Sequence, residues 1–163
     1  MKKRREKKGL NWKVLVLCLA LTYIVGFVGS LFTSQGANSE WYESIKPSIT
    51  PPNYIFTIIW DILFFLVALS LYFAWTGAKD DKKKEQITLA FGMNFLLNIL
   101  WSAIFFGMKN PLIALGEIKL LSLSIIWMGL VCWRANKLAT FLLIPYLAWV
   151  YFAGVINFII VFG

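Results

Sequence analysis

The chain has 163 residues, of which 60% are hydrophobic and only 15% are charged, and its mean hydropathy is +0.72. A soluble domain is about 45–50% apolar and about 25% charged. A chain this small has little interior in which to bury the additional apolar residues. The composition therefore excludes a soluble enzyme, a disordered chain and a disulfide scaffold. The net charge of +8 would suggest nucleic acid in a soluble protein, but the distribution of the basic residues indicates a membrane, and we expect no nucleic-acid partner.

Five apolar runs follow one another along the chain. They cover residues 14–32, 53–76, 86–107, 112–133 and 138–162. Each run matches the roughly 20 residues that a helix needs to cross the hydrocarbon core, and none has the short alternating strands of a membrane barrel. The sequence therefore predicts an all-α membrane protein, a bundle of five transmembrane helices in one domain at 14–162, after a basic tail at 1–13.

The first run follows a basic tail, as the core of a signal peptide does, but its 19 residues exceed the usual core of about 7–15. We therefore expect this run to remain as a span. Its small residues Gly26, Gly29 and Ser30 are interpreted as a surface for close helix packing. The polar break at 33–52 that follows is predicted to be a loop.

Basic residues predict the orientation of the five spans. The segment through Lys13 carries seven of the 16 Lys and Arg residues, the break at 77–85 carries four, and the break at 134–137 carries two. These segments share one side of the membrane, whereas the other side carries Lys46 and Lys109. The positive-inside rule then predicts a cytoplasmic N-terminus and an outside C-terminus, with the tail touching anionic lipid headgroups. We expect the plasma (inner) membrane of a prokaryote.

Three ionisable residues lie inside the runs, where such residues are functional candidates. Glu117 and Lys119 lie close to the start of the fourth run, so we interpret both as side chains that reach the membrane interface. Asp61 lies deeper and is the better candidate for a functional role. It follows Trp60 directly and does not share its helix face, so it can belong to the structure while Trp60 belongs to a site.

Tryptophans and amides form a pattern across the runs. Trp12, Trp75 and Trp133 lie at predicted span ends and are interpreted as interfacial anchors. Deeper aromatic and amide residues share single helix faces: Asn94, Asn98, Trp101 and Phe105; Pro145, Trp149, Ala153 and Asn157; and Trp60 and Phe64. Because amides are costly in lipid, these faces indicate either hydrogen bonds between helices or the wall of a pocket. Pro145 favours a pocket, since a proline inside a helix bends it.

Conventional catalytic chemistry has no support in this sequence. There is no histidine, and the two cysteines, Cys18 and Cys132, lie inside apolar runs, where they are interpreted as buried hydrophobic residues. We therefore expect no metal site and no obligatory cofactor. Any reaction would have to be driven by a cofactor, a ligand or light.

The ordered motifs of the chain resemble those of the translocator protein / tryptophan-rich sensory protein (TspO/MBR) family over residues 12–162. The matching residues are Trp41-Tyr42, Lys46-Pro47-Ser48, Pro51-Pro52, Trp60, Asn94, Asn98, Trp101-Ser102, Phe105-Phe106, Glu117, Leu121, Leu143 to Trp149, Phe152-Ala153 and Asn157. Ile49 departs from the pattern, because the family usually has Trp there. Tyr151 is followed by no basic residue, so the sterol-binding segment of animal members is not matched.

The resemblance implies a dimeric five-helix bundle whose pocket binds tetrapyrroles, such as protoporphyrin IX and haem, and other flat aromatic molecules beneath a lid formed by 33–52. The spacing Ala103-x-x-x-Gly107 is compatible with a homodimer. The resemblance and the helix faces together give these ligand-binding candidates: Tyr42, Pro51, Trp60, Phe64, Asn94, Asn98, Trp101, Phe105, Trp149 and Ala153.

We therefore expect an integral-membrane receptor for tetrapyrroles that acts in porphyrin sensing or homeostasis. Since the chain has no histidine to ligate haem iron, free-base porphyrin is expected to bind at least as well as haem. Two alternatives stay open. One is a light-dependent enzyme that degrades porphyrin through Trp60 and Trp149, and the other is a porphyrin or sterol transporter, which the lack of an internal repeat disfavours.

Overall fold

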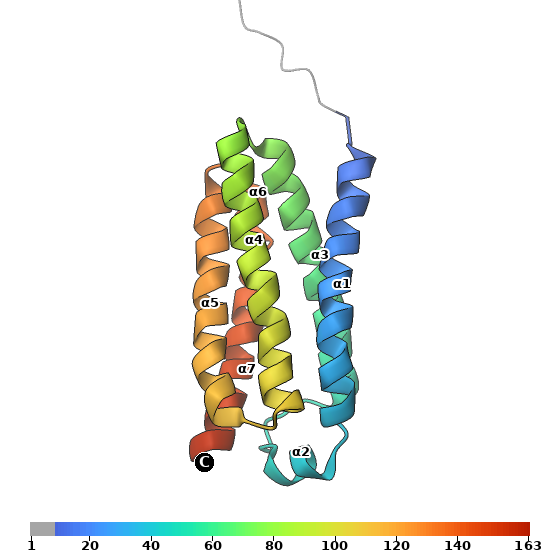
Figure 1. Ribbon diagram of the computed structural model, residues 1–163, viewed down its shortest axis with the longest axis vertical. Coiled ribbons are helices and arrows are strands. Elements are labelled where there is room, and N and C mark those ends of the chain that lie inside the picture. Colours follow the sequence, from blue (N-terminus) through green and yellow to red (C-terminus); the bar gives the residue numbers. More distant parts are fainter. Residues whose placement is uncertain (1–8) are drawn as a thin grey trace, which may run out of the picture.

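Residues 9–163 are described by a computed structural model, in which long helices run side by side (Figure 1). The elements in chain order are α1 Trp12–Gly36, α2 Glu40–Ile45, α3 Asn53–Gly77, α4 Asp81–Ser102, the π-helical turn η1 Ala103–Gly107, α5 Pro111–Trp133, α6 Lys137–Phe141 and α7 Ile144–Phe162. This part of the chain contains no strand. Five segments are long and apolar enough to span a membrane, counting α4 with η1 and α6 with α7, which confirms the predicted all-α fold.

Side-chain caps determine where the long helices begin. Asn11, Asp80 and Asn110 each accept a hydrogen bond from the backbone N–H three residues later, at the start of α1, α4 and α5. Helix α4 consequently begins at Asp81, well before the apolar run predicted at 86–107. The hydropathy pattern locates the part of a helix that lies in lipid, whereas the capping residues locate its end.

The predicted loop at 33–52 is partly helical. Its first residues continue α1 through Gly36, and the short helix α2 follows after Ser39, whose Oγ accepts a hydrogen bond of 3.2 Å from the backbone N–H of Tyr42. Figure 1 shows α2 at the end of the bundle opposite to the N-terminal end of α1. The segment therefore covers one end of the bundle.

The fifth span is interrupted near one end. The sequence predicted a bend at Pro145 inside a continuous run, 138–162. Instead α6 ends at Phe141, the chain turns, and Pro145 lies in the first turn of α7, where the missing N–H of proline costs no helical hydrogen bond. The cavity described below is bordered by residues much further along α7, so this interruption does not form it.

A π-helical turn ends α4. In η1 the backbone N–H of Met108 donates to the carbonyl of Ala103 at 2.8 Å, and Lys109 then turns the chain with a φ of 51°. Such turns widen a helix and change the direction of the side chains that follow. Phe105 and Phe106, both in η1, are buried in the bundle.

The interior and the outer surface of the bundle are both apolar. The most deeply buried large side chains come from α4, α5 and α7 and include Phe91, Leu121 and Val150. Outward-facing residues such as Leu96 and Leu130 are also large and hydrophobic. A surface of this kind suits lipid rather than water.

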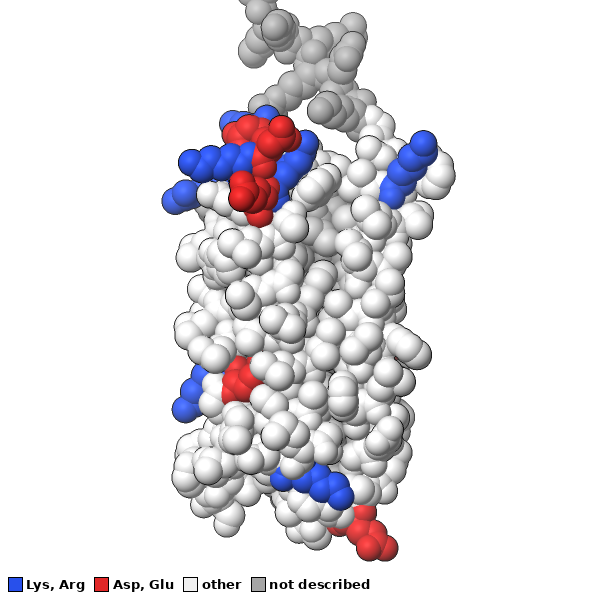
Figure 2. All heavy atoms as spheres, in the orientation of Figure 1, with Lys and Arg blue, Asp and Glu red and all other residues white. Residues whose placement is uncertain are grey.

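Charged side chains gather toward the two ends of the bundle, with a largely uncharged band between them (Figure 2). The three tryptophans predicted to be anchors lie at the end where α1 begins, and a lysine ammonium lies over each ring, with Nζ-to-centroid distances of 5.9 Å for Trp12, 5.9 Å for Trp75 and 4.9 Å for Trp133. Residues 1–8 of the predicted basic tail lie outside the described part. That this end faces the cytoplasm stays a prediction.

Candidate functional site: a cavity between the helices

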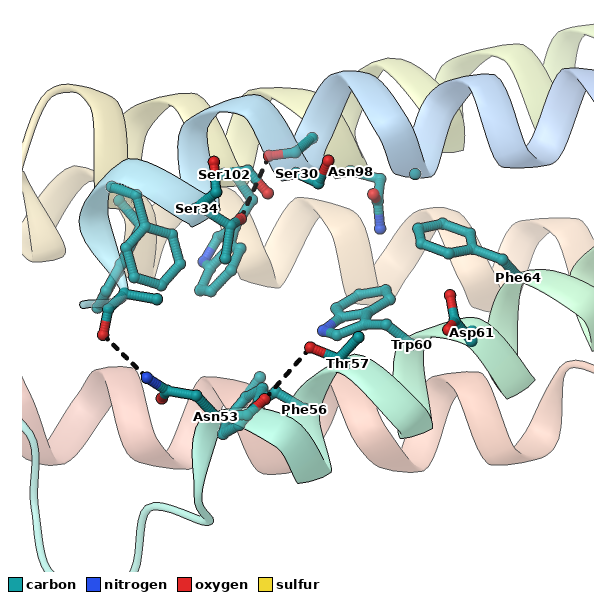
Figure 3. A pocket seen from close by; sticks show the side chains of 18 of the residues that line it. Ser30, Ser34, Asn53, Phe56, Thr57, Trp60, Asp61, Phe64, Asn98 and Ser102 are labelled. Carbon is teal, nitrogen blue, oxygen red and sulfur yellow. Dashed lines mark hydrogen bonds between the residues drawn. The ribbon is translucent and has the colours of Figure 1, made fainter.

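A cavity of about 520 Å³ lies between α1, α3, α4, η1 and α7, next to α2 (Figure 3). This volume is within the range of about 300–1,000 Å³ that is common for small-molecule sites. Residues on its open side, including Ser30 and Ser34 of α1 and Thr57 of α3, are exposed. The cavity therefore opens on the face of the bundle that meets lipid, between α1 and α3.

Two stacked aromatic pairs form much of the cavity wall. Trp60 and Phe64 of α3 stack with ring centroids 5.4 Å apart and an interplanar angle of 30°. Trp101 of α4 and Phe105 of η1 stack at 5.1 Å and 21°. The spacing of four residues within each pair places both rings on one helix face. Flat ring surfaces of this kind suit a flat aromatic ligand, which binds them by offset stacking.

A buried hydrogen-bond network lies behind the wall. Asn98 Nδ2 donates to the Tyr146 hydroxyl at 3.1 Å, this hydroxyl donates to Asn94 Oδ1 at 3.3 Å, and Asn94 Nδ2 donates to Ser124 Oγ at 2.8 Å. Asn98 lines the cavity, and Figure 3 shows its amide directed into that space. Asn94 lies one turn earlier in α4 and does not line the cavity. The sequence analysis left two roles open for the buried amides, hydrogen bonding between helices or lining a pocket. Asn94 has the first role, because it bonds to residues of two other helices.

Two buried polar atoms of cavity-lining residues have no hydrogen-bond partner among the described residues. They are the indole nitrogen of Trp101 and the amide oxygen of Asn157, whose Nδ2 donates to the carbonyl of Pro111 at 2.8 Å. Buried polar atoms are usually satisfied by protein, water or ligand. Both atoms are buried, so they lie behind the surface of the cavity wall in this structure.

Seven of the ten predicted ligand-binding residues line the cavity: Tyr42, Trp60, Phe64, Asn98, Trp101, Phe105 and Ala153. Pro51, Asn94 and Trp149 do not. Pro51 belongs to the connection just before α3. The ring of Trp149 packs edge-on against Phe56, at 5.2 Å and 67°, and Phe56 lines the cavity in its place. Of the two indoles considered for photochemistry, only that of Trp60 borders the cavity.

The sequence analysis missed the polar residues that line the α1 side and the start of α3. These are Ser30, Thr33, Ser34, Asn38, Asn53 and Thr57. The signal was present, because small or polar residues recur every four positions at Gly26, Ser30 and Ser34 of an apolar run. The close helix packing expected at Gly26 is present as well, because a Cβ on this glycine of α1 would lie 2.7 Å from the ring of Phe64 in α3.

The ionisable residues of the spans lie in three different environments. Glu117 was expected to reach the membrane interface, but it is only 6% exposed and its carboxylate oxygens have no partner among the described residues. The reason is its helix face, which it shares with the buried residues Ala114, Ile118 and Leu121. Lys119 lies on the exposed face of α5, and Asp61 lines the cavity.

Helix α2 closes the cavity at the end of the bundle opposite the start of α1. The ring of Tyr42 packs edge-on against Phe105 at 6.1 Å and against Phe106 at 5.4 Å. Burial raises the pKa of the Tyr42 hydroxyl, and the neighbouring Glu43 carboxylate raises it further, so the hydroxyl stays neutral and suits this apolar contact. Residues 33–36 of the predicted lid belong to α1, so from here on the lid means residues 37–46 alone.

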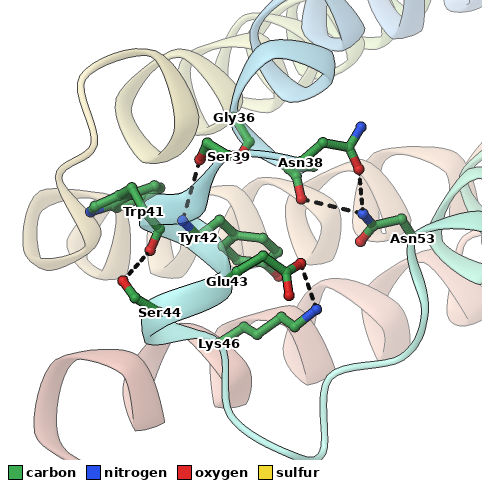
Figure 4. A network of polar contacts seen from close by, with 10 residues as sticks. Gly36, Asn38, Ser39, Trp41, Tyr42, Glu43, Ser44, Lys46 and Asn53 are labelled. Atoms are coloured by element: carbon green, nitrogen blue, oxygen red, sulfur yellow. Dashed lines mark hydrogen bonds and ion pairs between the residues drawn. The ribbon is translucent and has the colours of Figure 1, made fainter.

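Hydrogen bonds attach the lid to α3 (Figure 4). Asn53 Nδ2 donates to the side-chain oxygen of Asn38 at 2.8 Å and to the backbone carbonyl of Ala37 at 3.2 Å. Within the lid, Glu43 and Lys46 form an ion pair at 2.6 Å. The first residue of α3 therefore holds the segment that leads into α2.

Comparison with known proteins places the chain in a family. The model of the TspO/MBR family matches residues 18–162. The chain is 38% identical over 154 residues to "Tryptophan-rich protein TspO" of Archaeoglobus fulgidus, covering 93% of this chain and 97% of the relative. It is 41% identical over 147 residues to the protein of the same name from Chlorobaculum tepidum, covering 90% and 92%. It is also 31% identical over 134 residues to human "Translocator protein", covering 81% and 79%. With its five apolar helices, this chain belongs to the TspO/MBR family of integral membrane proteins.

Proposed function

We propose that this protein binds tetrapyrroles and similar flat aromatic molecules in the cavity between its helices, as a receptor in porphyrin sensing or homeostasis. The observation that carries the proposal is the pair of stacked aromatic walls, Trp60 with Phe64 and Trp101 with Phe105. Stacking contributes about 0.5–1.5 kcal/mol per aromatic pair beyond the burial of area. The amide of Asn98, which is directed into the cavity, adds a polar group beside these rings.

The names of relatives point to both sensing and translocation. We favour sensing for this chain, because five spans without an internal repeat lack the symmetry on which alternating-access transport usually rests. We also propose that the protein lies in the plasma membrane of a prokaryote, that the start of α1 faces the cytoplasm, and that the protein forms a homodimer. Porphyrin or haem is a ligand in this proposal and not a permanent cofactor.

The test is a titration of the protein in lipid nanodiscs with protoporphyrin IX, followed by quenching of tryptophan fluorescence and by porphyrin absorbance. Trp60→Leu removes a ring from the cavity wall and is expected to weaken binding about tenfold. Trp127→Leu is the matched control, because Trp127 is partly exposed on α5 and does not line the cavity. No saturable binding by the unsubstituted protein, or equal losses in both variants, would refute the proposal.

A further inference from the structure

Asp61 is the one acidic or basic residue among the cavity-lining residues that the structure describes. The other lining residues are aromatic, aliphatic, hydroxyl-bearing, amide-bearing or glycine, and no lysine or arginine is present among them. The two stacked aromatic pairs explain affinity for a flat ring, but they do not discriminate between ligands whose substituents differ in charge. A charged residue in the cavity wall can do so.

The position of Asp61 puts its carboxylate at the open side of the cavity. It is exposed, and Figure 3 shows it on α3 between Trp60 and Phe64. The first residue of α3 is Asn53, so Asp61 lies about 12 Å along the helix axis from that end. This distance places the carboxylate within the apolar band of the bundle rather than among the charged groups at its ends.

No described residue neutralises this carboxylate. The backbone carbonyl of Asp61 accepts a hydrogen bond of 3.4 Å from the hydroxyl of Tyr23, which also lines the cavity, but the carboxylate itself has no hydrogen bond among the described residues. The ion pairs of the described chain, Lys46 with Glu43 and Lys84 with Asp81, lie in the lid and at the start of α4. An ionised carboxylate in an apolar setting is stable only with a counter-charge or a donor nearby.

A bound ligand would meet this carboxylate directly. A ring stacked on Trp60 and Phe64 lies beside Asp61, so a protonated amine on a substituent is attracted and a ligand carboxylate is repelled, both more strongly than in water. We propose that Asp61 selects ligands by charge: the cavity prefers flat aromatic molecules with a cationic or uncharged substituent to those with carboxylates on the side of the α1–α3 opening. This inference rests on the proposed function, because it assumes a flat aromatic ligand in the cavity.

The test compares three free-base porphyrins that share one macrocycle. They are protoporphyrin IX with two carboxylates, its uncharged dimethyl ester, and the diamide whose two arms end in protonated amines. Binding is measured in nanodiscs of zwitterionic phosphatidylcholine, and partition into empty nanodiscs is subtracted. The unsubstituted protein is expected to bind the cationic porphyrin roughly five- to tenfold more tightly than the dicarboxylate, with the ester between them.

Two variants assign this preference to a residue. Asp61→Asn keeps the shape and removes the charge, and it is expected to abolish most of the difference in affinity between the cationic and the dicarboxylate porphyrin. Asp61→Ser repeats the test with a smaller side chain. Asp81→Asn is the charge-matched control, because this exposed residue lies at the start of α4, away from the cavity, and it should leave the order of affinities intact.

The outcomes separate this inference from the proposed function. If all three porphyrins bind but the dicarboxylate binds as tightly as the cationic one, the inference is wrong and the proposed function stands. Equal shifts for all three ligands in Asp61→Asn would likewise overturn it. If none of the three binds, the proposed function fails and the inference fails with it. The order of affinities in the unsubstituted protein is decisive even where a variant does not fold.

Discussion

Gly36, the last residue of α1, lies so close to Phe106 in the π-helical turn that a Cβ on this glycine would be 2.6 Å from the ring. The contact joins the end of α1, directly before the lid, to η1. Because Phe106 also packs against Tyr42, displacing its ring would disturb the closed end of the cavity.

Gly36→Ala should therefore destabilise the protein by about 1–3 kcal/mol, as overpacking does elsewhere. The measurement is thermal unfolding in detergent, followed by tryptophan fluorescence. Gly92→Ala is the control, since nothing lies within 4 Å of a Cβ at that helical position. Equal unfolding temperatures for the two variants would contradict the importance of this contact.

Trp60 and Trp149 should differ in their effect on ligand binding, although the sequence places both among the candidates. Trp60→Phe is expected to weaken protoporphyrin IX binding about two- to tenfold, because it shrinks a ring on the cavity wall. Trp149→Phe should change affinity less than about twofold, because Phe56 lines the cavity in its place. Fluorescence titration of both variants and of the double variant decides this. A larger loss for Trp149→Phe would mean that the ligand lies elsewhere.

Removing the hydroxyl of Tyr146 should cost stability. This hydroxyl links Asn98 to Asn94 between α7 and α4, so Tyr146→Phe leaves two buried amides with unmet hydrogen bonds and should destabilise the fold by about 1–3 kcal/mol. Tyr151→Phe removes the same atom from a residue that is 71% exposed, and it should have no measurable effect. Comparable unfolding midpoints in detergent for both variants would show that the network contributes little.

The chain has no histidine, so the cavity offers no imidazole to haem iron. Free-base protoporphyrin IX is expected to bind at least as tightly as haem. Absorbance titrations with both ligands in nanodiscs provide the comparison. Tighter binding of haem, accompanied by the spectrum of an iron with a strong protein ligand, would be evidence against this expectation.

The orientation of the bundle is open to a direct test. The basic residues on the described part of the chain concentrate at the end where α1 begins (Figure 2), so a reporter that is active only in the cytoplasm should work when fused to the N-terminus and fail when fused to the C-terminus. Fusion of a reporter that is active only outside should give the opposite result. The reverse pattern in both sets would show that the basic end faces outward.

Much of the fold is readable from the sequence, because hydropathy over about 20 residues is a strong signal for a span. Periodicity also grouped Trp60 with Phe64 on one helix face, and both line the cavity, since spacing determines direction around a helix. It does not determine depth along the axis. Asn94 and Asn98 share a face and both bond to the hydroxyl of Tyr146, yet only Asn98 lines the cavity.

Other features depended on contacts that no local pattern encodes. The polar residues at Ser30, Ser34 and Thr57 acquire a role only because the packing of the bundle leaves them beside the cavity. The burial of Glu117 follows from which face of α5 meets its neighbours, and a short distance from the end of an apolar run does not reveal it. The position of a site along a bundle therefore requires the packing of the whole chain.

The π-helical turn Ala103–Gly107 makes the shape of the binding space depend on chain length as well as on side-chain identity. Each residue of an α-helix advances the chain by about 100° around the axis, and a π turn accommodates one additional residue. Deleting a single residue there would restore regular winding and rotate Phe105 and Phe106 away from their present directions. Relatives that are one residue shorter in this stretch would have the same aromatic residues around a cavity of different shape. A one-residue insertion or deletion can therefore change which ligands the cavity accepts.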